Sequence, residues 1–111
     1  MAGLSVEDFE ADVHLVCSES PSVRTTVRHG AGADWVGLRV YMTDESLVDV
    51  FYNQKTGKTS FAHVRDGLRV FGADNRRGWH WHPREDPSRH IESKHAISFE
   101  EFFREVEKNI K

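Results

Sequence analysis

The sequence predicts an α+β domain, an antiparallel five-strand meander flanked by an N-terminal and a C-terminal helix. Three observations predict it. Apolar residues recur at helical spacing near both ends, apolar and polar residues alternate through residues 23–71, and the segments between the expected strands are short. Short connections favour antiparallel pairing, because parallel neighbours need a long crossover. The 111 residues are therefore expected to form one domain, 1–111.

Both predicted helices begin at a serine that can cap the first turn. Ser5 precedes a helix that runs to about residue 18, and Ser98 precedes a helix near the end of the chain. A serine at this position accepts a hydrogen bond from a backbone amide of the first turn. The apolar residues of the two helices recur every three or four positions: Val6, Phe9, Val13 and Val16, then Phe99, Phe102, Phe103, Val106 and Ile110. We expect both stripes to cover one face of the sheet.

Five strands are expected between the helices, at residues 23–28, 35–42, 47–52, 59–65 and 68–71. Asp66-Gly67 indicates a two-residue hairpin, because glycine tolerates the positive φ of such a turn. The alternation stops after residue 71. Residues 72–97 contain four of the chain's Gly and Pro residues and show no sustained period, so they are expected to form an irregular loop. Loops of this length often carry function.

Histidine and positive charge gather in the same part of the chain. Residues 61–95 contain seven Lys and Arg against five Asp and Glu, whereas residues 1–60 contain five against nine. The same segment holds five of the seven histidines: His63, His80, His82, His90 and His95. The net charge of −3 therefore hides a basic, titratable segment, and local charge governs anionic partners more than the sum does.

Composition argues against several protein classes. No apolar run approaches the roughly 18 residues needed to span a bilayer, and the first residues lack the pattern of a signal peptide. The lone Cys17 excludes an intramolecular disulfide and a multi-thiolate zinc site. We expect a cytoplasmic, reduced protein without a membrane partner. Its three Asn and one Gln are few, as is typical of thermophilic sources.

The segment Trp79-His80-Trp81-His82 carries the strongest functional pattern. In an extended conformation the two histidines project from one face, toward solvent or substrate, and the two tryptophans project from the other, toward the core. Because imidazole titrates near 6.5, His80 and His82 could act as general base and general acid in metal-independent cleavage of RNA. Such a ribonuclease needs no cofactor.

The same hypothesis gives roles to nearby charged residues. Asp74 would orient a histidine tautomer, as carboxylates do beside functional imidazoles. Arg76, Arg77 and Arg89 would contact phosphate through paired guanidinium hydrogen bonds.

Two other classes of function fit the same residues. His-x-His on a strand is a ligand spacing, and the set His80, His82, His90 and His95, or Asp74 in place of one of them, could hold zinc or another divalent transition metal. Alternatively the segment is a binding surface without catalysis, for bases and phosphates or for an acidic partner protein. Each alternative is compatible with a homodimer.

Gly72-Ala73-Asp74-Asn75, followed by His80-x-His82-Pro83, His90, His95 and a Phe-rich helix, resembles the TumE-like toxin family of toxin–antitoxin systems and related archaeal proteins of unknown function. The likeness covers roughly residues 36–110. It implies the toxin half of a toxin–antitoxin pair, with a cognate antitoxin protein as partner. Together with the histidine pair it leads us to expect a toxin that acts on RNA. It also implies that Asp74, Asn75, His80 and His82 are the site residues, with Asn75 in binding.

Overall fold

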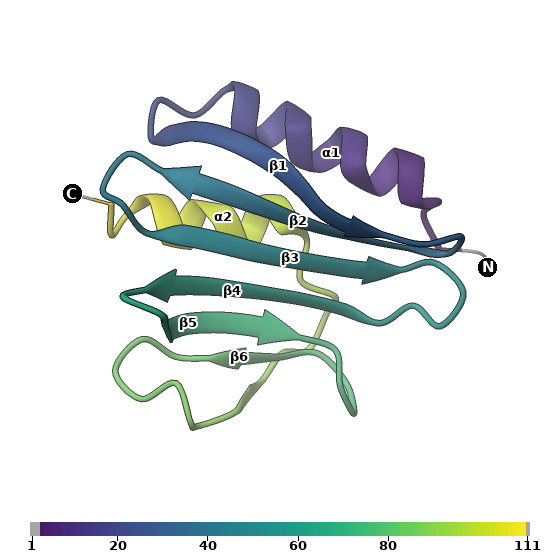
Figure 1. The fold of residues 1–111 in the computed structure, drawn as a ribbon. Coiled ribbons are helices and arrows are strands. Elements are labelled where there is room, and N and C mark those ends of the chain that lie inside the picture. The colour runs from purple at the N-terminus through teal and green to yellow at the C-terminus, as the bar shows by residue number, and fades with distance from the viewer. Residues whose placement is uncertain (1–2, 111) are drawn as a thin grey trace.

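A computed structural model describes residues 3–110 and confirms the α+β class. Its strands form one sheet in sequence order, and every neighbouring pair is antiparallel (Figure 1). The elements are α1 (Val6–Ser18), β1 (Val23–Ala31), β2 (Trp35–Met42), β3 (Leu47–Asn53), β4 (Thr59–Arg65), β5 (Leu68–Asp74), β6 (His80–His82), β7 (Ile91–Glu92) and α2 (Phe99–Glu107). No helix among the described residues is long and apolar enough to cross a membrane.

The prediction of five strands is wrong, because the described part of the chain forms seven. The expected irregular loop, residues 72–97, contains the end of β5 and the whole of β6 and β7. Strands β6 and β7 have three and two residues, too few to produce a hydrophobic period. In addition, His80 and His82 are buried there, so a polar residue type occupies positions where the pattern requires an apolar one.

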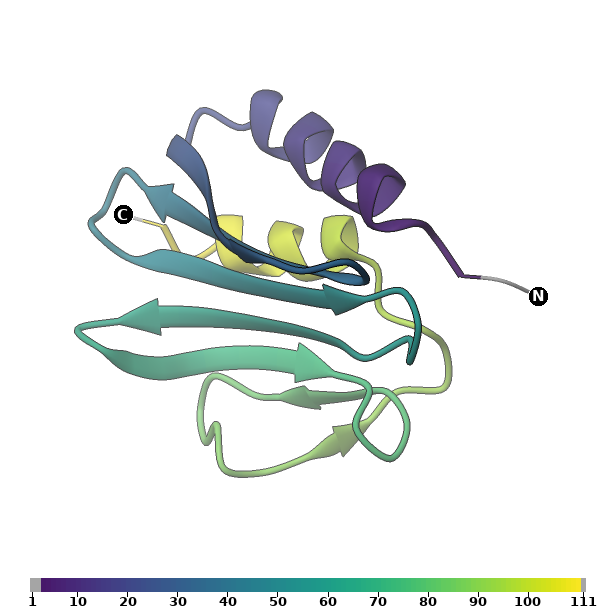
Figure 2. The same ribbon diagram turned by 45° about the vertical axis from the view of Figure 1, so that its right-hand side comes forward.

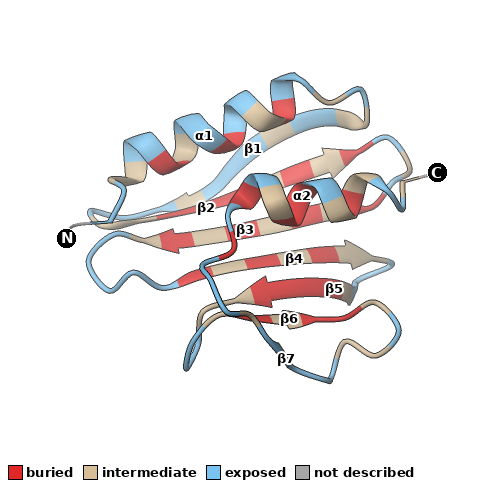
Figure 3. Ribbon diagram, turned by 180° about the vertical axis from the view of Figure 1, so that it is seen from behind, coloured by how far each residue is buried: buried red, intermediate tan, exposed pale blue. Residues whose placement is uncertain are grey.

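Both helices lie on the same face of the sheet, as the sequence predicts. Helix α1 contacts β1, β2 and β3, and α2 contacts β4 and β5 (Figures 2 and 3). The core lies between the helices and the sheet, and its fully buried residues include Leu38, Val50, Phe102 and Phe103. The opposite face of the sheet has no helix over it within residues 3–110.

Serine caps fix where both helices start. The Ser5 hydroxyl accepts a hydrogen bond from the amide of Asp8 at 3.1 Å, and the Ser98 hydroxyl accepts one from the amide of Glu101 at 3.0 Å. These bonds satisfy amides that have no partner within the helix. Both predicted caps are confirmed, and α2 consequently begins just after the histidine-rich segment.

Candidate functional site

The pairing of β5 with β6 decides which side chains share a face. Gly72 lies opposite His82, and Asp74 lies opposite His80. Cross-strand partners project to the same side of a sheet, so Asp74, His80 and His82 share the face that the helices leave uncovered. The aspartate and both histidines therefore meet at one end of this face.

The tryptophans beside these histidines anchor β6 to the core. Trp81 stacks on Phe71 with ring centroids 5.6 Å apart and lies 6.4 Å from Phe102 of α2. Trp79 stacks on Phe61 at 6.1 Å. The predicted division, with tryptophans toward the core and histidines on the other face, is confirmed.

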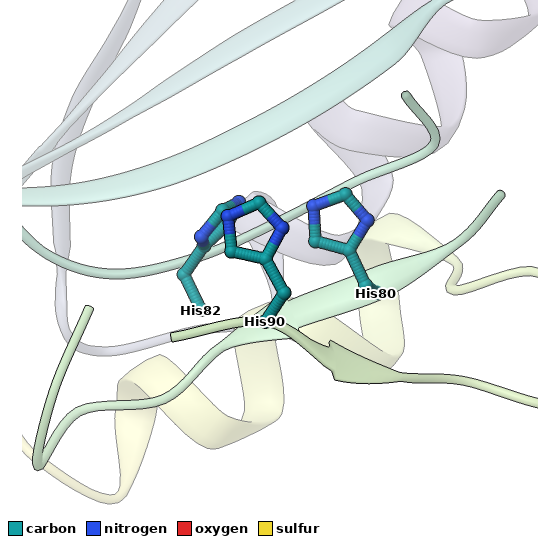
Figure 4. A group of neighbouring side chains, drawn as sticks. All are labelled: His80, His82 and His90. Carbon is teal, nitrogen blue, oxygen red and sulfur yellow. The ribbon is translucent and has the colours of Figure 1, made fainter. Parts of the chain in front are cut away.

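A third ring completes a histidine cluster, defined here as His80, His82 and His90. His90 lies just before β7 and brings its ring parallel to that of His80, at 4.5 Å between centroids and an interplanar angle of 4°. Its centroid lies 4.6 Å from that of His82. One ring nitrogen from each of the three residues lies within 4.8 Å of the others. Figure 4 shows the three rings on the same side of β6.

The Asp74 carboxylate joins the first two histidines. Its Oδ2 lies 2.9 Å from Nε2 of His82, and its Oδ1 lies 3.2 Å from Nε2 of His80. The backbone amide of Arg76 also donates to Oδ1, at 3.0 Å. Burial acts to raise the pKa of Asp74, but these hydrogen bonds and the two imidazoles outweigh it and lower the pKa below its ordinary value of 3.8. The carboxylate is therefore ionised at neutral pH.

Backbone carbonyls hold the opposite ring nitrogens of the same histidines. Nδ1 of His80 lies 3.1 Å from the carbonyl oxygen of Gly78, and Nδ1 of His82 lies 3.2 Å from that of Pro87. A carbonyl only accepts, so each Nδ1 carries the proton, and in a neutral ring Nε2 presents its lone pair. Both lone pairs then point at a carboxylate that also only accepts. Such an arrangement is favourable only when a cation, either a proton or a metal ion, lies between them.

The two strand histidines are less exposed than the sequence pattern indicates. His80 and His82 are only 8% and 3% exposed, so their rings are not directed at open solvent, whereas His90 is exposed. Desolvation and the neighbouring His82 and His80 lower the pKa of His90 below its ordinary value. His90 is therefore the exposed member of the histidine cluster.

Arginines border a cavity of about 590 Å³ around the histidine cluster. Arg76 and Arg77, both predicted to bind phosphate, line it. Arg69 lines it too and was missed at the sequence level. The pairing steps from His63 opposite Phe71 to Val64 opposite Arg69, which leaves an extra residue in β5. Such a bulge reverses the alternation of side chains, so periodicity assigns Arg69 to the wrong face.

Three predicted site residues lie away from the histidine cluster. The amide of Asn75 accepts from the backbone of Thr59 at 2.9 Å and donates to the carbonyl of Gly57 at 2.8 Å, so it ties the end of β5 to the turn before β4. His95 faces the carboxylate of Glu101, with 3.3 Å from Nε2 to each oxygen. Arg89 is exposed and does not line the cavity.

The likeness to TumE-like toxins stays a prediction, based on Asp74, Asn75, His80 and His82 and the elements around them. No family model, curated protein or solved structure matches the chain.

Proposed function

We propose that this protein binds one divalent transition-metal ion, preferably zinc, through His80, His82, His90 and Asp74. One observation carries the proposal: both strand histidines donate Nδ1–H to a backbone carbonyl while both Nε2 atoms converge on one carboxylate. Metal-ligating histidines nearly always hold the other ring nitrogen in this way, which fixes the tautomer and directs the free lone pair at the metal.

The distances support the same proposal. With bonds of about 2.0–2.1 Å from zinc to nitrogen and oxygen, neighbouring ligand atoms of a tetrahedral site lie roughly 3.3 Å apart. The Asp74 oxygens lie 2.9 and 3.2 Å from the two Nε2 atoms, close to that spacing. The His90 ring is exposed, so it can approach by a small movement from its place within 4.8 Å.

The ligand types favour zinc among divalent ions. Imidazole and carboxylate together suit zinc and the neighbouring divalent transition metals, among which geometry and availability decide, whereas magnesium and calcium require oxygen ligands almost exclusively. The chain's one thiol, Cys17, is buried in α1 and takes no part in the histidine cluster.

Metal analysis tests the proposal directly. Protein stripped with a chelator, reloaded with zinc and desalted is expected to retain one ion per chain. The double variant His80→Ala/His82→Ala should retain none, and His95→Ala, a matched histidine outside the cluster, should retain one. Substoichiometric zinc in the wild type, or full zinc in the double variant, would refute the proposal. Circular dichroism of each variant checks that the fold persists.

Metal-independent RNA cleavage by His80 and His82 is a second candidate. The observation that favours it is that Arg76 and Arg77 line the same cavity as both histidines and Asp74, which brings acid–base groups and phosphate-binding groups together. Chelator-treated protein incubated with structured RNA separates the two candidates. Cleavage that survives the chelator and is lost in His80→Ala/His82→Ala supports the ribonuclease. Intact RNA at high protein excess excludes it.

We also propose a toxin role, which the sequence likeness alone supports. A toxin arrests growth when it is expressed without its antitoxin. Induced expression of the wild type should therefore stop growth of a bacterial host, while His80→Ala/His82→Ala should not. Equal growth of both cultures at equal protein level would contradict this role.

A further inference from the structure

The cavity beside the histidine cluster has a charge imbalance that its own residues do not correct. Arg69, Arg76 and Arg77 line it together with the acids Asp74 and Glu92. Within residues 3–110, none of the three arginines forms an ion pair with a carboxylate, while Asp74 is already engaged by His80 and His82. The cavity therefore presents guanidinium groups that no carboxylate neutralises.

The backbone positions these arginines around the cluster from two directions. Arg69 approaches along β5, and its guanidinium donates to the carbonyl of Pro87 at 3.2 Å. Arg76 and Arg77 lie in the turn between β5 and β6, where Arg77 has a φ of 58° and Gly78 a φ of 97°. Positive φ values at consecutive residues are typical of hairpin turns, so this turn fixes the backbone from which Arg76 and Arg77 project. Cationic groups thus stand at both ends of the His80–His82 pair.

We propose that this cavity binds a phosphate group, with one oxygen on the metal ion and the others on Arg76, Arg77 and Arg69. The inference rests on the proposed metal site. Three arginines and a divalent ion outweigh the two carboxylates of the cavity, and a phosphate dianion provides the missing negative charge. Guanidinium forks match phosphate oxygens with paired hydrogen bonds, and metal ions commonly share phosphate ligands with them.

The size of the cavity indicates a phosphate ester rather than free phosphate. A volume of about 590 Å³ falls in the range of cavities that hold drug-sized ligands, which is far larger than one phosphate group. The ligand can present its phosphate as a terminal monoester, as in a mononucleotide, or as a diester within a nucleic-acid backbone. Both sources share the chemistry that the arginines and the metal recognise.

The test measures phosphate binding to protein loaded with cobalt(II), a paramagnetic substitute for zinc. Phosphorus NMR follows inorganic phosphate, a nucleoside 5′-monophosphate and an RNA oligonucleotide without terminal phosphate, and line broadening reports a phosphorus atom beside the metal. Saturable broadening is expected for at least one phosphate ester. Broadening by the mononucleotide alone identifies a terminal phosphate, and broadening by the oligonucleotide as well identifies a backbone phosphate.

Arginine variants locate the binding in the cavity. Arg76→Ala/Arg77→Ala should weaken binding by at least about tenfold, since one hydrogen bond to a charged group contributes on this order. Arg89→Ala should bind like the wild type, because Arg89 lies outside the cavity lining. Titration calorimetry, which needs no paramagnetic ion, should show weaker phosphate binding to metal-free protein than to loaded protein. Equal binding by all variants, or binding that does not change when the metal is removed, would overturn the inference.

Metal content, measured on the same samples, separates this inference from the proposed function. If the protein holds one ion per chain and no phosphate probe broadens, the inference fails and the metal site stands. If the protein takes up no metal, the proposed function fails and the inference fails with it.

Discussion

Two histidine regions of this protein differ in how their ring nitrogens are paired. His63, on the helix-covered face of β4, has no exposed surface. Its Nδ1 accepts from the guanidinium of Arg84 at 3.2 Å, and its Nε2 donates to the Ser46 hydroxyl at 2.9 Å. Ser46 in turn donates to Asp44, which also accepts from Arg65 at 2.6 Å. Every donor in this buried network meets an acceptor.

In the histidine cluster, donors and acceptors are not paired in this way. His80 and His82 have carbonyl oxygens at Nδ1 and the Asp74 carboxylate at Nε2, so acceptors surround each ring. Burial alone therefore does not mark a functional histidine, because His63 is the most buried of all. What distinguishes the cluster is that both Nε2 atoms face a carboxylate that only accepts, an arrangement that requires a proton or a metal ion between them. The comparison predicts that the buried His63 network contributes to the stability of the fold and that the histidine cluster binds the metal ion.

The largest expected effect is the pH dependence of stability that His63 causes. Burial lowers the pKa of His63 from 6.5 to about 4, and the positive charges of Arg84 and Arg65 act in the same direction. The negative charge of Asp44 opposes this shift but does not cancel it. The unfolded chain therefore binds a proton in this interval and the folded chain does not. The free energy of unfolding that this histidine contributes is complete above pH 6.5 and declines as the pH falls toward 4, by up to about 3 kcal/mol.

Urea titrations at pH 7 and pH 4 measure this decline. His63→Gln, whose amide can still accept from Arg84 and donate to Ser46, should lose markedly less stability over the interval than the wild type. His95→Gln is the control, since it removes an exposed histidine and should follow the wild type. Identical pH dependence in wild type and His63→Gln would show that the buried ring is not the group responsible.

The next effect is the stabilisation by zinc, which should depend on the cluster alone. Zinc at about 100 times its Kd raises the free energy of unfolding by roughly 2.7 kcal/mol when it binds only the folded state. His63→Gln should keep this gain, and His80→Ala/His82→Ala should lose it. Thermal unfolding with zinc and with chelator measures the difference. A gain that survives the double variant would place the metal elsewhere.

A third effect comes from a change in the buried His63 network, which should lower stability and leave zinc binding unchanged. Arg84→Met removes the donor to Nδ1 of His63 and the guanidinium that lies 4.9 Å from the Phe71 ring. Leaving a buried acceptor unpaired should lower the free energy of unfolding by about 2 kcal/mol. Zinc content should remain at one ion per chain. Loss of zinc from a folded Arg84→Met protein would show that the two regions are coupled.

The smallest effect concerns the turn that holds His80. Gly78 has a φ of 97°, and its carbonyl accepts from Nδ1 of His80. Gly78→Ala should cost about 1 kcal/mol of stability because alanine resists this conformation. It should also weaken zinc binding modestly, because the carbonyl orients the ring. Gly57→Ala, at a φ of 78° in a turn outside the cluster, is the matched control and should leave zinc affinity unchanged.

The sequence predicts the scaffold better than it predicts the site. Helical spacing and serine caps correctly place both helices, and alternation locates the first five strands. The sequence does not predict β6 and β7, because these strands form by pairing, β6 with β5 and β7 with β6, rather than from a local pattern. The bulge in β5 likewise cannot be predicted from the sequence, so the face on which Arg69 lies is known only from the pairing of β4 with β5.

Within the histidine cluster, the two strand residues were predictable and the loop residue was not. Alternation puts His80 and His82 on one face, which the pairing with β5 confirms. Nothing in the spacing distinguishes His90 from His95, yet one joins the cluster and the other faces Glu101. The path of the irregular segment between β6 and β7 decides this. The backbone carbonyls of Gly78 and Pro87, which orient the rings of His80 and His82, cannot be predicted from the sequence either.

The measurement that tests the central claim most directly is X-ray absorption at the zinc edge of the reloaded protein. A centre built from His80, His82, His90 and Asp74 predicts three imidazole ligands and one oxygen at about 2.0–2.1 Å, with the multiple-scattering pattern of histidine rings. The same spectrum should be retained in His95→Ala. A first shell of oxygen alone, or an imidazole pattern that persists in His80→Ala/His82→Ala, would contradict the account.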